Sequence, residues 1–261
     1  MKTISSQRIK TTNCFHFLEI SKVLLATGYP YYGQTEIIDL QSSNGFCENE
    51  PSFFKEIWGA TGALIGGKKP LICGGFKEDT KEYVNHCYRL KWNGIERKSW
   101  WVFFTEMSTK RLFAASIESN GSRLWILGGI TDGNVHLDST EYIMFDGKIT
   151  QGKDMPLALF GHTIVALDEH DFEHDFLIIG GHTNAYGSVS QDTFYYSSDG
   201  NGTWVDGPVL NEGRWNHVAG IGVDDLSNNY IAVVGGLKGG ILLDSVEILW
   251  QNEAAWHKLG I

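Results

Sequence analysis

The sequence is poor in positive charge and has no long apolar run. Lys and Arg together number 21 against 31 Asp and Glu, which gives a formal net charge of −10 at pH 7. Because nucleic-acid binding depends on clustered Lys and Arg that neutralise phosphates, we expect no nucleic-acid partner. No apolar stretch approaches the roughly 20 residues that cross a bilayer, so we expect no membrane span. The N-terminal stretch MKTISSQRIKTTNCF lacks the apolar core of a signal peptide, which predicts a cytoplasmic chain as written.

Cysteine and proline are also scarce. The four cysteines are Cys14, Cys47, Cys73 and Cys87. They are too few and too irregularly spaced for a disulfide scaffold, and no CxxC pair indicates zinc, so we expect no metal and no cofactor. The chain has 5 Pro but 31 Gly, and hydrophobic residues make up 42% of it. This composition is typical of a folded domain with many tight turns.

An internal repeat runs through most of the chain. An apolar run followed by two glycines occurs as PLICGG, LWILGG, FLIIGG and IAVVGG, with the second glycines at Gly75, Gly129, Gly181 and Gly236. The gaps between these glycines are 54, 52 and 55 residues. VLLATG, which ends at Gly28, is a degenerate fifth copy. A period of about fifty residues predicts a repeat architecture.

Each repeat contains about four predicted β-strands. A strand with period-two alternation follows each diglycine, in TEIIDL, HCYRLKW, STEYIMF, DTFYYSS and DSVEILW. A strand of small or apolar residues precedes each of the four clear diglycines, within residues 60–67, 112–119, 160–167 and 216–223. Several repeats close with a segment that carries Trp. Four strands per fifty residues predict a blade of a β-propeller.

The repeat resembles the kelch repeat family, whose motif is a diglycine, a spacer, a strand that often carries Glu and Tyr, and a later Trp. The match is best in the third and fifth repeats, which contain LWILGG…STEY and RWNH…VVGG…SVEILW…W. The resemblance covers roughly residues 13–261. It implies an all-β, kelch-type β-propeller of about five four-stranded blades, with an incomplete six-bladed propeller as the alternative. NCFHFLEI, residues 13–20, is expected to form either the inner strand of the first blade or an edge strand that closes the ring.

The expected domain organisation is a short N-terminal segment, residues 1–12, followed by the propeller, residues 13–261. Each expected blade contains one copy of the motif. The blades cover approximately residues 13–52, 53–107, 108–155, 156–208 and 209–261.

The loops at one end of a propeller channel converge, and they carry the candidate binding residues. Aromatic and arginine side chains on convergent loops are typical anchors of protein interfaces. The partner-binding candidates are Arg111, Arg214, Trp215, His182, Tyr186, Tyr31 and Tyr32. The alternative for the two arginines is that they hold loops in place by hydrogen bonds. If they lie on the surface, replacing Arg214 and Trp215 by alanine should abolish partner binding and leave the melting temperature nearly unchanged.

The sequence predicts a non-enzymatic propeller that binds a protein or peptide partner on its loop face. The kelch resemblance implies, by analogy, an adaptor role such as ubiquitin-ligase substrate recognition or actin association. The alternative is a small-molecule or sugar-binding protein, or a sialic-acid-type enzyme, that acts in the propeller channel. Acids and histidines with shifted pKa values along the channel would favour that alternative. The inner-strand segments ATGALIGG and FAASI are mostly small and apolar, which favours partner binding.

Cys73 and Cys87 fall on the second and third strands of the second repeat, which are expected to be antiparallel neighbours. If the two residues lie opposite each other, they can form a disulfide, which would imply an oxidising compartment and an extracellular protein with an incomplete N-terminus. The alternative is two buried free thiols. Cys14 and Cys47 are expected to be unpaired.

Overall fold

The chain folds almost entirely into β-strands. Apart from the 3-10 turn η1 (Asp132–Asn134), the part of the chain that the structure describes contains no helix. It therefore has no helix long and apolar enough to cross a membrane. The computed structural model describes the chain as follows, with the backbone alone up to residue 49: residues 10–16, 22–29, 35–39, 47–49, 53, 56–66, 69–93, 98–119, 122–167, 174–183, 188–198, 202–251 and 253–259.

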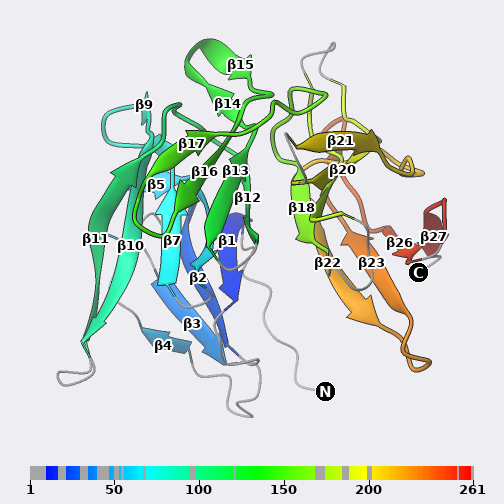
Figure 1. The fold of residues 1–261 in the computed structure, drawn as a ribbon, viewed down its shortest axis with the longest axis horizontal. Coiled ribbons are helices and arrows are strands. Elements are labelled where there is room, and N and C mark those ends of the chain that lie inside the picture. Colours follow the sequence, from blue (N-terminus) through cyan, green and yellow to red (C-terminus); the bar gives the residue numbers. More distant parts are fainter. Residues whose placement is uncertain are drawn as a thin grey trace.

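Five four-stranded antiparallel sheets follow one another along the described chain (Figure 1). The first contains β1 (Lys10–His16), β2 (Lys22–Tyr29), β3 (Thr35–Asp39) and β4 (Cys47–Asn49). The second contains β6 (Thr61–Ile65), β7 (Lys69–Cys73), β10 (His86–Asn93) and β11 (Lys98–Glu106). The third contains β12 (Ala115–Ser119), β13 (Arg123–Leu127), β16 (Thr140–Met144) and β17 (Ile149–Gln151).

The last two sheets have the same order of strands. The fourth contains β18 (Thr163–Ala166), β19 (Phe176–Ile179), β20 (Thr193–Ser197) and β21 (Thr203–Asp206). The fifth contains β22 (Val218–Val223), β23 (Asn229–Val234), β26 (Val246–Trp250) and β27 (His257–Leu259). In every sheet the strands pair in the order in which they occur along the chain.

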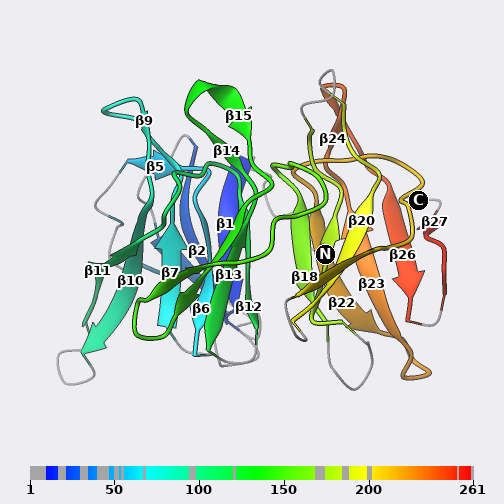
Figure 2. The same ribbon diagram turned by 45° about the horizontal axis from the view of Figure 1, so that its top comes forward.

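Short strands from the loops after the second strands, and one that precedes the first strand of the second sheet, gather at one end of the molecule, which we call the loop face (Figure 2). Three small sheets form there. They contain β5 (Ile57–Trp58) with β8 (Phe76–Lys77) and β9 (Glu82–Tyr83), β14 (Ile130–Thr131) with β15 (Val135–His136), and β24 (Leu237–Lys238) with β25 (Ile241–Leu242).

The core lies between neighbouring sheets. The first strands β1, β6, β12, β18 and β22 contact one another in chain order. Trp125 and Leu127 of β13 pack with Ile178 of β19. On the other face of β19, Leu177 packs with Ile231 of β23. A strand covered on both faces needs a continuous apolar run, which explains the runs that precede the diglycines.

The diglycines are required because neighbouring sheets approach closely at this point. Gly128 and Gly129 have φ values of +59° and +96°, which side chains disfavour. A Cβ atom on Gly128 would lie 2.5 Å from the carbonyl oxygen of Leu159 in the fourth sheet. The amide of Gly129 donates to the same oxygen over 2.8 Å. In the second, third and fourth sheets the diglycine turn is therefore also a joint to the following sheet.

The sheets lie within the expected repeats, with one difference at the N-terminus. β1 begins at Lys10, inside the segment expected to precede the first blade. It pairs with β2 from Lys10 opposite Tyr29 to His16 opposite Val23. The stretch that starts at residue 13 thus contributes to the first strand of the first sheet, and not to a separate edge strand.

The structure contains the Cys73–Cys87 disulfide. The two residues lie directly opposite each other on β7 and β10. Because the bridge closes a loop with a sequence separation of 14 residues, we expect its removal to lower the free energy of unfolding by about 2–3 kcal/mol. Urea denaturation of the oxidised protein and of a Cys73→Ala, Cys87→Ala variant measures this loss. Intact mass before and after alkylation is the control, and four free thiols in the native protein would contradict the prediction.

Candidate functional site

Four sheets begin at the loop face with a residue in the left-handed conformation. These residues are Gly59, Phe113, Gly161 and Asn216, with φ values between +51° and +62°. The amide of Phe113 donates to Gly59 over 2.8 Å, that of Gly161 to Phe113 over 3.0 Å, and that of Asn216 to Gly161 over 2.7 Å. This chain of main-chain hydrogen bonds fixes the second to fifth sheets to one another at the loop face.

The residue before each left-handed position pairs with the residue after the diglycine of the same sheet. This holds the loop that follows the diglycine against the entrance of the first strand. The pairs are Trp58 with Phe76, Leu112 with Ile130, Phe160 with His182, and Trp215 with Leu237.

Ring side chains from these positions form a continuous row across the loop face, which we call the loop-face belt. Phe113 lies 5.7 Å from Trp58 and 6.2 Å from Phe160, measured between ring centroids. The ring of Phe160 lies 4.8 Å from that of His182 and 5.5 Å from that of Trp215. These separations are typical of favourable aromatic pairs. The belt consists of Trp58, Phe113, His136, Phe160, His182 and Trp215.

The belt contains no Asp, Glu, Lys or Arg side chain, and ionic groups lie beside it. Burial lowers the pKa of His136, and the nearby His182 lowers it further, so His136 is neutral at pH 7. Nδ1 of His136 and Nδ1 of His182 have no hydrogen-bond partner among the described residues. Nε1 of Trp58 donates to Oε2 of Glu78 over 2.9 Å. The pKa of the Glu78 carboxyl is lowered by hydrogen bonds from Lys81 and Trp58.

Arg111 is fully buried in the third sheet. Its Nη1 donates to the carbonyl oxygens of Gly128 and Ser139, each over 2.8 Å, and its Nε donates to Oε1 of Glu141 over 3.0 Å. The same Glu141 accepts a hydrogen bond from the amide of Ser108 over 2.7 Å. Burial lowers the pKa of Arg111, and the Glu141 carboxylate opposes this shift. The ion pair thus connects the diglycine turn to β16.

Arg214 has the same arrangement in the fifth sheet. Its Nη1 donates to Gly235 over 2.8 Å, and its Nη2 donates to Oε1 of Glu247 over 2.7 Å. Arg111 and Arg214 are 1% and 0% exposed. Neither guanidinium reaches the surface, because each is enclosed by the carbonyls and the carboxylate of its own sheet. This corrects the sequence prediction that placed both arginines on the partner-binding surface, and it agrees with the alternative that they hold loops in place.

No family model matches the chain, and no curated protein matches it by sequence. The structure is similar to a solved structure titled "Structure of YjhT", with a TM-score of 0.74 and 15% sequence identity. The match covers 97% of this chain and 84% of that chain. The fold is a β-propeller. In this fold each four-stranded sheet is a blade, the first strand of a blade is its inner strand, and the diglycine turns lie between blades.

The structure brings two of the predicted binding residues into the belt. His182 and Trp215 are both half-buried there, and their ring centroids lie 5.7 Å apart. Tyr31, Tyr32 and Tyr186 lie outside the described residues.

Sequence reasoning missed four members of the belt: Trp58, Phe113, His136 and Phe160. A usable signal for three of them exists in the stretches WGA, LFA, FGH and WNH, which enter the inner strands of the second to fifth blades. Each stretch has an aromatic residue at or just before the left-handed position. An alignment of the repeats on their diglycines alone does not show this pattern. His136 lies on a loop strand outside the repeat motif.

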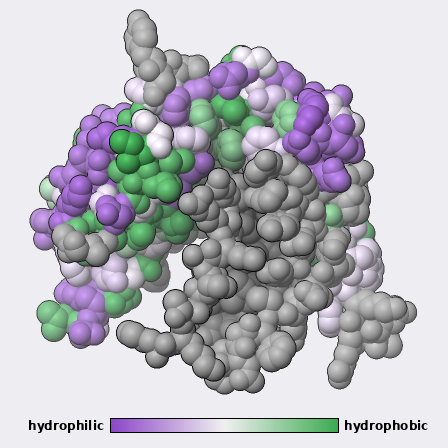
Figure 3. Space-filling model, turned by 180° about the vertical axis from the view of Figure 1, so that it is seen from behind, coloured by the Kyte–Doolittle hydropathy of each residue, from purple (hydrophilic) through white to green (hydrophobic). Residues whose placement is uncertain are grey.

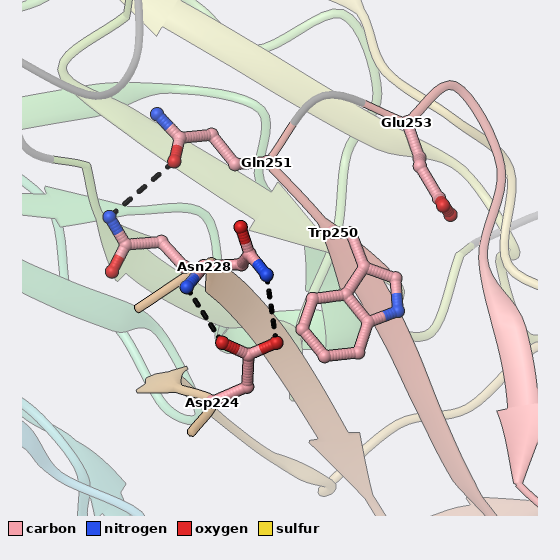
Figure 4. Close-up of a pocket in the computed structure, with 6 residues that line it drawn as sticks. Asp224, Asn228, Trp250, Gln251 and Glu253 are labelled. Carbon is pink, nitrogen blue, oxygen red and sulfur yellow. Dashed lines mark hydrogen bonds between the residues drawn. The ribbon is translucent and has the colours of Figure 1, made fainter. Parts of the chain in front are cut away.

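The described residues contain a pocket of about 300 Å³ (Figure 4). It lies in the fifth blade, away from the belt. Its lining residues are Asp224, Asn228, Asn229, Trp250, Gln251 and Glu253. Asp224 accepts hydrogen bonds from the amide and the side chain of Asn228 over 2.7 and 2.9 Å, and these bonds lower the pKa of its carboxyl. The carboxylate therefore stabilises its own turn. No group of three or more His, Cys, Asp or Glu in the described part of the chain is placed to hold a metal ion.

Proposed function

We propose that this chain is a non-enzymatic, kelch-type β-propeller that binds a protein or peptide partner on its loop face. The observation that carries the proposal is the loop-face belt, in which six ring side chains from four blades meet in one row. The diglycine repeat with a period of about fifty residues supports the kelch type.

The chemistry of the belt suits a partner with apolar or aromatic side chains. Half-buried Trp and Phe rings offer a large contact area and lose little side-chain entropy on binding, which is why such residues dominate the energetics of protein interfaces. Lys110 and Asp132 form an ion pair of 3.3 Å beside the belt, and Lys238 and Glu212 form one of 3.5 Å. Charged groups at the edge of an apolar strip orient a partner and add little affinity.

The two buried histidines support binding over catalysis in the channel. His162 and His217 precede inner strands, and burial lowers the pKa of each to about 3. However, a Cβ atom on Gly128 would lie 3.0 Å from the His162 ring, and one on Gly180 would lie 3.1 Å from the His217 ring. Both imidazoles are thus packed beneath the diglycine turns of the preceding blade, where a channel substrate does not reach them.

Replacement of Trp215 by alanine tests the proposal. Random peptides displayed on phage are selected against the wild-type protein, and the enriched peptide is then titrated against each variant. We expect Trp215→Ala to weaken its binding at least tenfold, because loss of a central aromatic anchor costs about 2 kcal/mol or more. Trp92→Ala is the matched control, since Trp92 is 60% exposed on β10 and lies outside the belt.

The proposal fails if no peptide is enriched, or if Trp92→Ala and Trp215→Ala weaken binding equally. Thermal denaturation of both variants separates a loss of binding from a loss of folding. A Trp215→Phe variant, which keeps an aromatic ring at the same position, is expected to retain most of the affinity.

A further inference from the structure

The second strand of the fifth blade is apolar on both sides but covered on only one. Its sequence, NYIAVV, is as apolar as the runs in the other blades. Ile231 and Val233 pack toward the fourth blade and are 0% exposed. Val234 points to the opposite side and is 47% exposed. A strand with this sequence is typically covered on both faces.

The uncovered side continues across the whole sheet as an apolar row. Val218 is paired with Val234, Val234 with Val246, and Val246 with Leu259, so the four side chains lie on one face. Val218 is 70% exposed and Leu259 is 45% exposed. Figure 3 shows hydrophobic side chains gathered on the side of the molecule formed by the C-terminal strands. Toward the other end of this face, Tyr230 and Trp250 pack at a centroid distance of 5.1 Å, beside the pocket in Figure 4.

The equivalent side of the second, third and fourth blades is covered by the blade that follows. Counted back from the diglycine, Cys73, Leu127 and Ile179 occupy the position of Val234. All three are 0% exposed. The inner strands show the same difference, because β6, β12 and β18 each have a following inner strand beside them. No contact of similar extent joins β22 to β1 in the described part of the chain.

The fifth blade also presents two main-chain groups of the kind that form hydrogen bonds between neighbouring blades, the amide of Gly236 and the carbonyl of Asn216. Gly75, Gly129 and Gly181 each donate an amide hydrogen bond to the following blade, to Arg111, Leu159 and Arg214 respectively, over 2.7–2.8 Å. The equivalent amide of Gly236 has no acceptor among the described residues. The carbonyl of Asn216, which would continue the chain of bonds between left-handed residues, has no donor there either.

The first glycine of each diglycine differs in how closely the following blade approaches it. A Cβ atom on Gly74, Gly128 or Gly180 would lie 2.5–2.6 Å from a carbonyl oxygen of the following blade. A Cβ atom on Gly235 would meet nothing closer than 3.5 Å. The fifth blade therefore keeps a glycine suited to a close approach that no described residue makes.

We propose that this face of the fifth blade binds a sixth blade, a four-stranded antiparallel sheet supplied by another polypeptide. Three blade interfaces within the chain, from the second blade to the fifth, have the same construction. The fifth blade presents the same apolar row, glycine amide and carbonyl that the earlier blades present to the blade that follows them. This inference concerns a different face from the loop-face belt and does not depend on the proposed function.

The probe for this site is a synthetic polypeptide with the sequence of the fourth repeat, residues 156–208. It contains the Leu159 carbonyl and the Gly161 amide, which make the two bonds at the interface between the third and fourth blades. The full 261-residue chain is titrated with this probe, and complex formation is followed by native mass spectrometry. We expect a 1:1 complex in which hydrogen exchange of the Gly236 amide slows at least tenfold.

Charged residues on the face should prevent this complex. Val218→Lys with Val234→Lys is expected to weaken probe binding at least tenfold, while both side chains are exposed enough for the chain to fold without the probe. The matched control is Leu226→Lys with Val209→Lys, since these residues are 82% and 57% exposed and lie outside the apolar row. The control variant is expected to bind like the wild type.

Three results would overturn the proposal. The probe, free or joined to the C-terminus by a Gly/Ser linker, leaves the exchange of Gly236 unchanged. The wild-type chain is a dimer that Val218→Lys with Val234→Lys converts to a monomer, which would assign the face to a second copy. The amide of Gly236 is already protected in the isolated monomer, which would show that the chain covers this face itself.

Discussion

Replacement of Arg214 by methionine is expected to lower the free energy of unfolding by about 3–5 kcal/mol, because it leaves the Glu247 carboxylate buried without its cation. Both side chains of this pair are 0% exposed. Arg214 also donates to Gly235 and Ser245, so the variant loses the connection between the diglycine turn and β26. Urea denaturation at pH 7 measures the loss. This is opposite to the expectation from the sequence, in which replacing Arg214 and Trp215 together by alanine leaves the melting temperature nearly unchanged.

A surface ion pair of the same blade provides the control. Lys258 pairs with Glu212 over 3.2 Å, and its side chain is 51% exposed. Lys258→Met should therefore change stability very little. Arg214→Met combined with Glu247→Leu is expected to recover part of the loss, since it removes the unpaired charge. A loss for Arg214→Met no larger than that for Lys258→Met would show that the pair is not buried in solution.

The second large effect is a loss of stability between pH 6.5 and pH 3. Burial lowers the pKa of His162 and of His217 to about 3, and the charge of Arg214 contributes to the shift of His217. In the unfolded chain both imidazoles titrate near their ordinary pKa of about 6.5. As the pH falls below that value, the unfolded state binds protons that the folded state does not. Each histidine then lowers the free energy of unfolding by up to about 1.4 kcal/mol per pH unit.

Urea denaturation at pH 7, 6 and 5 measures this slope. Burial also lowers the pKa of His136, so His136 contributes a smaller change of the same sign. The lowered carboxyl pKa values of Glu212 and Asp224 affect stability only at lower pH, because these groups start from 4.5 and 3.8. A His162→Met variant should show a clearly smaller slope than the wild type. Equal stability at pH 7 and pH 5 would contradict the prediction.

Much of the fold could be predicted because a propeller repeats its constraints. Gly128 must be glycine for two reasons, a turn with positive φ and a close approach of the next blade, and the same pair of glycines recurs in the other repeats. The alternation in STEYIMF reflects a third strand in which Glu141 and Ile143 are buried on one face while Tyr142 and Met144 on the other are half-buried. The sequence placed Cys73 and Cys87 on antiparallel neighbouring strands but left a disulfide and two buried thiols as alternatives, because the register of the strands was not predictable; the structure places them opposite each other in a disulfide.

The site was harder to predict because the environment of an arginine depends on tertiary packing. Arg111 precedes an inner strand, which places it near the loop face, but Glu141 lies thirty residues later and the sequence does not show that the two meet. The belt was missed for a related reason. Phe113 and Phe160 belong to different repeats, and their contact depends on how closely two blades approach.

The chain of hydrogen bonds through Gly59, Phe113, Gly161 and Asn216 affects which residues of the loop face can be substituted during evolution. These bonds join main-chain atoms, so they do not depend on the identity of most side chains around them. Trp58, Phe160 and Trp215 can therefore be exchanged for other residues while the blades remain joined. Such a scaffold can acquire a new binding preference by substitutions at the belt without first losing its fold, and the same property makes these positions suitable for a combinatorial library.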